Sequence, residues 1–189
     1  LPNGVDRERF APLDREAARR RLGERLGFPI PPGPLLLSVG HLVERKGHHI
    51  LVEALARLER EHGVRATLLV VGAASEEGNY SGPIAAAAAA LPRPGAVILA
   101  GEAPQAELHL FFNAADLTCL ASSKEGRPNV LLESIACGTP VVATDAWGIP
   151  EVVSDSRVGL LAERTPHAFA ATIAAALERR WDRAFIRDF

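Results

Sequence analysis

Short apolar runs alternate with helical patterns along most of this chain, and the alternation limits the folds that it can adopt. The runs are rich in valine, leucine and isoleucine and lie at residues 35–40, 66–72, 96–100, 116–121 and 140–144, with a sixth at 158–162. Strands separated by single helices pair in parallel through right-handed crossovers. The sequence therefore predicts an α/β fold, a Rossmann-like three-layer parallel sheet with helices on both faces.

The helix after the first run has the clearest pattern. Its apolar residues recur every three or four positions: Leu51, Ala54, Leu55 and Leu58. Gly63 supplies the stop. The six alanines at 85–90 have high helix propensity and little to bury, so we expect a surface helix there. The polar loop 75–82 follows the second strand. It either moves over a bound ligand or is a passive connection without a role in binding.

Composition sets the class of protein. With 189 residues and 48% hydrophobic residues, the chain can form one domain with its own core. The formal net charge of −2 predicts no nucleic-acid partner. Arginines gather near the start, at Arg15, Arg19, Arg20, Arg21 and Arg25. We interpret them as the solvated face of a helix capped by Asp14.

The cysteines predict the cellular compartment of the protein, and the two ends of the chain predict that it is part of a longer one. Cys119 and Cys137 form neither a metal motif nor a disulfide framework and are expected to be buried thiols in a reducing compartment. No apolar span of membrane length and no signal peptide is present, which predicts a cytoplasmic protein. The linker-like start LPNGVD lacks an initiator methionine, and WDRAFIRDF breaks off early in a helix-like pattern. We therefore expect a piece of a longer protein.

Segment 122–153 combines two carboxylates with a helix start and stop. Glu125 stands before the helix, Pro128 suits its first position, and Glu133 lies inside it, roughly 7 Å from its start. Gly138 and Pro140 end the helix before the next strand. Glutamate pairs eight apart occur elsewhere in the chain, but only this pair has that context. A helix opening at the carboxyl edge of a parallel sheet suits a phosphate, and Glu133 suits a diol such as ribose.

This segment resembles the donor-site signature of family 4 glycosyltransferases, EGxxxxxxE followed by a helix ending in CGTPVVA. The blocks LPNGVDRERFAP, SVGHLVERKGHHILVEAL, ATLLVVG, VILAGEAP and FFNAADLTCLASS follow in the family's order. The resemblance covers nearly the whole chain. It implies the C-terminal half of a two-domain GT-B enzyme, with residues 1–12 as the interdomain hinge and residues 13–189 as the nucleotide-sugar donor-binding domain.

The resemblance also implies a donor site, which comprises Gly40, His41, Arg45, Lys46, Leu99, Ala100, Gly101, Glu102, Glu125, Gly126, Arg127, Pro128, Asn129, Val130 and Glu133. Lys46 would hold the diphosphate and stabilise the leaving group, and Glu125 would orient the sugar and stabilise positive charge, so these two are the catalytic candidates. Residues 99–102 would hold the nucleobase, and residues 126–130 would offer backbone N–H groups. Gly40 and Gly72, which both end strands, either permit close approach of a ligand or shape turns.

His41 departs from the family, which usually has arginine after the first-strand glycine. Either Arg45 substitutes for that charge, or donor binding becomes pH-dependent through His41. A metal site from His41, His48 and His49 is disfavoured, because adjacent histidines on a helix point about 100° apart. We expect no metal and no cofactor beyond the nucleotide-sugar co-substrate.

The leading functional hypothesis is a retaining hexosyltransferase domain that uses a UDP-sugar or GDP-sugar. The acceptor would be a glycan or lipid-linked glycan of polysaccharide biosynthesis. Its pocket would lie in an N-terminal domain outside this chain, so the chain alone would be inactive, and the full-length protein would be peripheral at a membrane. The alternatives are a nucleotide-sugar epimerase of the same architecture and a non-catalytic nucleotide-sugar-binding domain. A dehydrogenase is disfavoured because no G-x-G-x-x-G follows the first strand.

Overall fold

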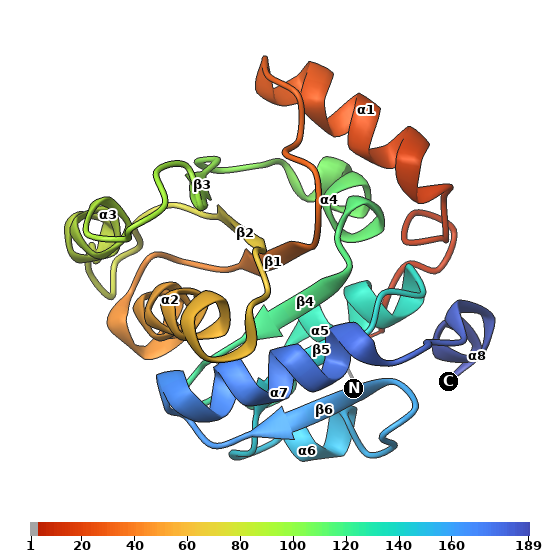
Figure 1. Cartoon of the computed structure of the whole chain (residues 1–189). Helices are drawn as coiled ribbons and strands as arrows, with labels where there is room; N and C mark the ends of the chain where they lie inside the picture. Colours follow the sequence, from red (N-terminus) through yellow and green to blue (C-terminus); the bar gives the residue numbers. More distant parts are fainter. Residues whose placement is uncertain (1–3) are drawn as a thin grey trace.

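The predicted parallel sheet is confirmed by a computed structural model that describes residues 4–189 (Figure 1). The strands are β1 (Leu35–Val39), β2 (Thr67–Val71), β3 (Val97–Leu99), β4 (Leu117–Leu120), β5 (Val141–Thr144) and β6 (Gly159–Ala162). They pair in the order β3-β2-β1-β4-β5-β6, and every pair is parallel. All carboxyl ends therefore lie at one edge, toward which the arrowheads of β4 and β6 point on the left of Figure 1.

Helices cover both faces of the sheet and complete the three layers. They are α1 (Arg15–Leu26), α2 (His48–His62), α3 (Ser81–Ala89), α4 (Leu108–Ala114), α5 (Asn129–Ala136), α6 (Ile149–Val152), α7 (Pro166–Glu178) and α8 (Arg183–Asp188). Two 3₁₀ turns, η1 (Glu44–Lys46) and η2 (Gln105–Glu107), lie in the connections after β1 and β3. One face carries α2, α3 and α7, and the other carries α1, α4 and α5.

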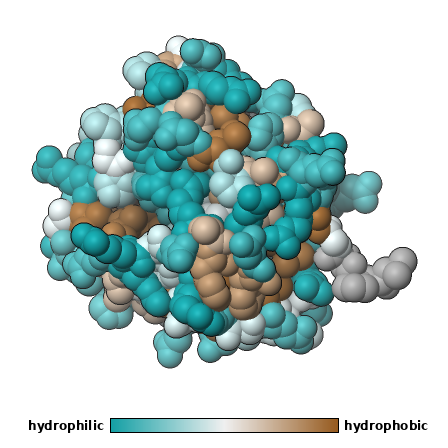
Figure 2. All heavy atoms as spheres, turned by 90° about the vertical axis from the view of Figure 1, so that its right-hand side faces the viewer, coloured by the Kyte–Doolittle hydropathy of each residue, from teal (hydrophilic) through white to brown (hydrophobic). Residues whose placement is uncertain are grey.

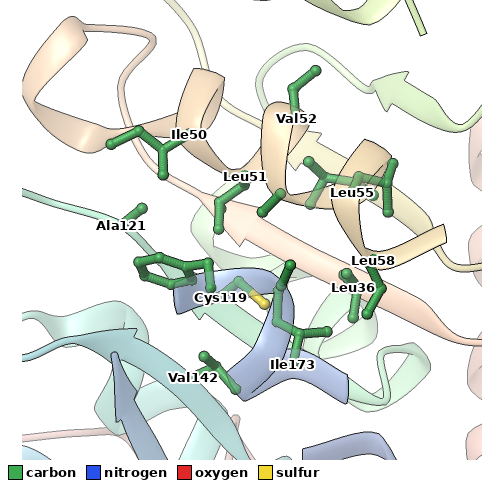
Figure 3. Packing of buried hydrophobic residues seen from close by; sticks show 14 of the residues in the cluster. Leu36, Ile50, Leu51, Val52, Leu55, Leu58, Cys119, Ala121, Val142 and Ile173 are labelled. Atoms are coloured by element: carbon green, nitrogen blue, oxygen red, sulfur yellow. The ribbon is translucent and has the colours of Figure 1, made fainter. Parts of the chain in front are cut away.

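The core of the first face lies between α2, α7 and the sheet. Leu51, Leu55 and Leu58 of α2 belong to one cluster with Cys119 of β4 and Ile173 of α7, and Figure 3 shows this cluster between the two helices and the sheet. The four residues predicted as the apolar face of this helix are all buried, and Gly63 ends it in a left-handed conformation, as predicted. The alanine-rich helix α3 buries Ile84 and leaves most of its alanines partly or fully exposed.

The core of the second face includes the beginning of the described chain. Phe10 is 2% exposed and packs edge-on against Phe112 of α4, with ring centroids 6.0 Å apart. The predicted hinge segment 1–12 thus packs against this domain from Phe10, while its first three residues lie outside the described part. The boundary between hinge and domain stays a prediction.

Three of the clustered arginines pair with carboxylates of other elements and do not form a solvated face, which corrects the interpretation of α1. Arg15 Nη1 lies 2.7 Å from Asp116 Oδ1, and Arg19 Nη2 lies 2.6 Å from Asp116 Oδ2. The backbone N–H of Leu35 donates to the same carboxylate at 2.7 Å. Asp116 therefore ties α1 to the start of β1, which an isolated helix pattern does not reveal. Arg25 Nε lies 2.7 Å from Glu107 Oε2, and its guanidinium lies over the Phe111 ring. Arg20 and Arg21 are exposed as expected, and Asp14 caps the helix as predicted.

Helix α5 differs from the prediction by one residue at its start. It begins at Asn129, so Pro128 is the extended cap residue before the helix and not its first residue. Its end is as predicted, because Gly138 follows with a φ of +70°. Cys119 and Cys137 are buried as expected, and burial raises the pKa of each thiol to about 12.

The surface that faces right in Figure 1 is shown in Figure 2. Hydrophilic side chains occupy most of this view and separate its apolar patches from one another. Within residues 4–189, none of the helices combines the length and apolarity that a membrane crossing requires.

Asp116→Ala is expected to lower the free energy of unfolding by about 2–4 kcal/mol, because it leaves two half-buried guanidinium groups and one N–H group without their acceptor. The control is Asp188→Ala, which removes an exposed carboxylate 3.7 Å from Arg7 and should change stability by less than about 0.5 kcal/mol. Urea unfolding of both variants measures the difference. Equal effects would show that Asp116 does not anchor α1.

Candidate functional site

A hollow of about 360 Å³ lies at the carboxyl edge of the sheet, over the ends of β1 and β2. Its lining comprises Val39, Gly40, His41, Arg45, Lys46, Val71, Gly72, Ala73, Glu77, Glu102, Ala103 and Leu108. A larger hollow of about 670 Å³ lies beside α1 and residues 27–32, but it contains none of the predicted site residues. The smaller hollow is therefore the candidate site, because ligands of open parallel sheets bind at this edge.

Two glycines bring the strand ends of the hollow close together. Gly72 has a φ of +155°, and a Cβ atom on it would lie 1.9 Å from the carbonyl oxygen of Gly40. Gly40 in turn donates to Val71 O at 3.0 Å. Gly72 was predicted either to permit close approach of a ligand or to shape a turn. The close contact with Gly40 gives the second role a direct structural basis.

A buried histidine, His48, bonds to the loop between β1 and α2 and holds it in place. His48 Nε2 lies 3.3 Å from the carbonyl oxygen of His41, and its Nδ1 lies 2.9 Å from Ser38 Oγ. Burial lowers the pKa of His48 to about 4, so the ring is neutral near pH 7. Because a carbonyl oxygen only accepts, Nε2 carries the proton and Nδ1 accepts from the Ser38 hydroxyl. His48 is thereby a support of the loop.

The same loop contacts the β4–α5 loop through both backbone and charge. Arg45 O accepts from Ser123 N at 2.8 Å. Gly47 has a φ of +71°, and a Cβ there would lie 2.2 Å from Ala121 O. Lys46 Nζ lies 2.5 Å from Glu125 Oε1, and these two side chains are only 15% and 13% exposed. The two catalytic candidates therefore form one largely buried ion pair.

Arg45 lies between two carboxylates. Its Nη2 donates to Glu77 Oε1 at 2.7 Å and its Nε donates to Glu77 Oε2, which makes a two-point contact. Its Nη1 lies 3.7 Å from Glu125 Oε1. Arg45, Lys46, Glu77 and Glu125 thus form a charge cluster with two positive and two negative groups.

Glu133 lies one turn into α5 and is 7% exposed. Gln105 Nε2 of η2 donates to its Oε1 at 3.2 Å. Burial raises the pKa of Glu133, and the hydrogen bond from Gln105 opposes this in part. A buried carboxylate needs hydrogen-bond donors to compensate for the loss of water, and Gln105 supplies one of them.

Some of the remaining predicted residues line the hollow, and others lie outside it. His41 and Glu102 line the hollow with exposed side chains. Gly101 O accepts from Gly72 N at 2.8 Å, and Leu99 is 42% exposed on the edge strand β3. The side chain of Arg127, in contrast, lines a separate hollow of about 200 Å³. Residues Gly126, Pro128, Asn129 and Val130 surround the start of α5, where helix N–H groups lack helical partners.

Two polar residues of the site were not predicted from the sequence. Glu77 and Gln105 lie in the connections after β2 and β3, at the same edge as the predicted residues. Their positions after strands were a usable signal, because parallel strands bring such connections together. The partners that they contact, Arg45 and Glu133, follow only from the folded chain.

Comparisons with known proteins agree with the geometry. The family model described as glycosyl transferases group 1 matches residues 27–187. The D-inositol 3-phosphate glycosyltransferase of Segniliparus rotundus is 38% identical over 179 residues, which cover 94% of this chain and 38% of that protein. This chain therefore spans well under half the length of that relative.

Solved structures show the same architecture. Sucrose-phosphate synthase from Thermosynechococcus elongatus superposes with a TM-score of 0.82 at 28% identity, over 99% of this chain and 44% of that chain. HepE of Anabaena, solved in complex with UDP, superposes with a TM-score of 0.75 at 26% identity, over 98% of this chain and 54% of that chain. By its sequence and its fold, this chain belongs to the glycosyl transferases group 1 family.

Proposed function

We propose that this chain is the donor-binding domain of a retaining glycosyltransferase that transfers a hexosyl group from a nucleoside-diphosphate sugar. The observation that carries the proposal is the Lys46–Glu125 pair at the carboxyl edge, with Nζ and Oε1 2.5 Å apart. It joins a cation suited to a diphosphate with a carboxylate suited to a sugar, and both belong to the family's pattern. The rest of the site supplies what the remainder of such a donor requires.

In this proposal Lys46 holds the diphosphate and stabilises the negative charge that develops on the leaving group. Fixed charges in a partly buried site stabilise such charge strongly, because they need no reorganisation during the reaction. The N–H groups of Gly126, Arg127, Asn129 and Val130, at and just before the start of α5, add hydrogen-bond donors, and the helix adds the positive end of its dipole. Transfer without a metal is therefore our expectation. His41 stays an open candidate for a further phosphate contact.

The buried carboxylate of Glu133 is proposed to accept hydrogen bonds from the two ribose hydroxyls of the donor. Gln105, which bonds it at 3.2 Å, keeps the carboxylate oriented. Leu99, Ala100, Gly101 and Glu102 are proposed to contact the nucleobase. Glu125 is proposed to orient the transferred sugar and to stabilise positive charge on it.

The relatives narrow the substrates of the proposed enzyme. HepE was solved with UDP, which favours a UDP-sugar over a GDP-sugar. A glycan or lipid-linked glycan is our proposed acceptor, and the name of the Segniliparus relative suggests a phosphorylated inositol as a second class. The acceptor pocket is proposed to lie in a further, N-terminal domain, and the full-length protein is proposed to be cytoplasmic and peripheral at a membrane. The epimerase alternative is not carried forward, because the relatives reported above are named as transferases and synthases.

Lys46→Met is expected to weaken UDP binding by about 10- to 100-fold, because a hydrogen bond between charged groups contributes about 1.5–3 kcal/mol. Lys124→Met is the matched control, since Lys46 and Lys124 are the two lysines of the sequence and Lys124 lies over the Trp147 ring at 4.3 Å. Calorimetric titration with UDP, GDP and ADP measures the affinities and identifies the base. If the chain binds none of the three, or both variants bind as the wild type does, the proposed donor site is wrong.

Glu133→Gln is expected to raise the free energy of unfolding at pH 7 while it weakens UDP binding. Burial raises the pKa of Glu133 in the folded state, so this residue favours folding when protonated, and that contribution is lost as the pH rises through the raised pKa. The stability gain of the variant should therefore shrink as the pH falls through the raised pKa and vanish near and below the ordinary pKa of glutamate. Urea unfolding from pH 4 to pH 8 checks this, with the exposed Glu102→Gln as control. A gain that does not depend on pH would contradict the assignment.

A further inference from the structure

The connection after β2 forms a tight turn with two glutamates at its tip. Ser75 N donates to Gly78 O at 3.0 Å, and Gly78 N donates to Ser75 O at 2.9 Å, which closes a small antiparallel bridge around Glu76 and Glu77. Glu77 N also lies 3.3 Å from Ser75 Oγ. The backbone at Glu77 is thus fixed by the turn, and the direction of its side chain follows from it.

Both ends of this connection are bonded to the loop that carries Arg45 and Lys46. Leu42 N donates to Ala73 O at 2.8 Å, and Tyr80 N donates to Leu42 O at 2.6 Å. Leu42 is buried, so these bonds are shielded from water. The Glu77 turn is therefore held against the loop that contains η1.

Glu77 forms a two-point contact with Arg45 at the wall of the hollow. The hydrogen bond from Arg45 lowers the pKa of Glu77, so its carboxylate is ionised near pH 7. The Arg45 and Glu77 side chains are 36% and 50% exposed, which leaves the pair open to competition from a dissolved anion. The neighbouring Lys46–Glu125 pair is more deeply buried.

We propose that Glu77 is a specificity-determining residue of the donor site, because its carboxylate holds Arg45 and a donor diphosphate must displace it. This inference rests on the proposed function of the hollow. A diphosphate carries more negative charge than one carboxylate and can reach Lys46 and Arg45 together, whereas a neutral sugar offers Arg45 nothing in exchange for Glu77. Glu77 thereby sets a threshold of ligand charge for occupying the hollow.

The test measures UDP binding to the chain by calorimetry with four variants: Glu77→Gln, Glu76→Gln, Arg45→Gln and the double variant Arg45→Gln/Glu77→Gln. Glu77→Gln should tighten UDP binding about 2- to 5-fold, in line with the modest strength of exposed ion pairs. Glu76 is the matched control, because it stands at the tip of the same turn, is exposed and makes no ion pair within residues 4–189. In the Arg45→Gln background the gain from Glu77→Gln should disappear, as a double-mutant cycle requires for a direct interaction.

Each other outcome overturns the proposal. Equal tightening by Glu76→Gln and Glu77→Gln would show a general effect of net charge, as would a gain that persists without Arg45. Weaker binding by Glu77→Gln would show that Glu77 positions Arg45 for the ligand. If the wild type binds UDP and Glu77→Gln does not differ from it, this inference fails while the proposed function stands. If neither binds any nucleoside diphosphate, both fail together.

Discussion

Strand β1 pairs with β2 on one side and with β4 on the other, and this double pairing brings the charged groups of the candidate site together. The connection after β1 carries Arg45 and Lys46, the one after β2 carries Glu77, and the one after β4 carries Glu125. Because the three strands are parallel and adjacent, their connections meet at one edge. Loss of either pairing would separate the cations from their carboxylates.

Close backbone packing converts this proximity into defined distances. The carbonyl oxygens of Gly40 and Ala121 occupy the space that a Cβ atom on Gly72 or Gly47 would need. The neutral, buried His48 holds the β1–α2 loop through its contacts with Ser38 and the carbonyl oxygen of His41. Such rigid support matters for a site of opposed charges, since a shift of about 1 Å changes electrostatic stabilisation substantially.

The distribution of charge and burial in the site follows its proposed chemistry. The Lys46–Glu125 pair is largely buried, whereas the Arg45–Glu77 pair is open to water. A buried ion pair is weak evidence for stability, because desolvation offsets most of its Coulomb energy. Glu133, buried with one amide partner, opposes stability at neutral pH in the same way. Neither group is expected to add much to folding stability, which is consistent with the donor-binding roles proposed for them.

The sequence by itself determined the fold class, the six strands and the family, and it named most of the residues that we propose as donor contacts. It did so because hydrophobic periodicity and the spacing of motif residues are local properties that a linear pattern records. The tertiary structure alone decided that Arg15 and Arg19 bind Asp116, that Gln105 supports Glu133, and that Glu77 holds Arg45. These partners are separated by 28 to 101 positions along the chain, and only strand order and loop packing bring them within hydrogen-bonding distance.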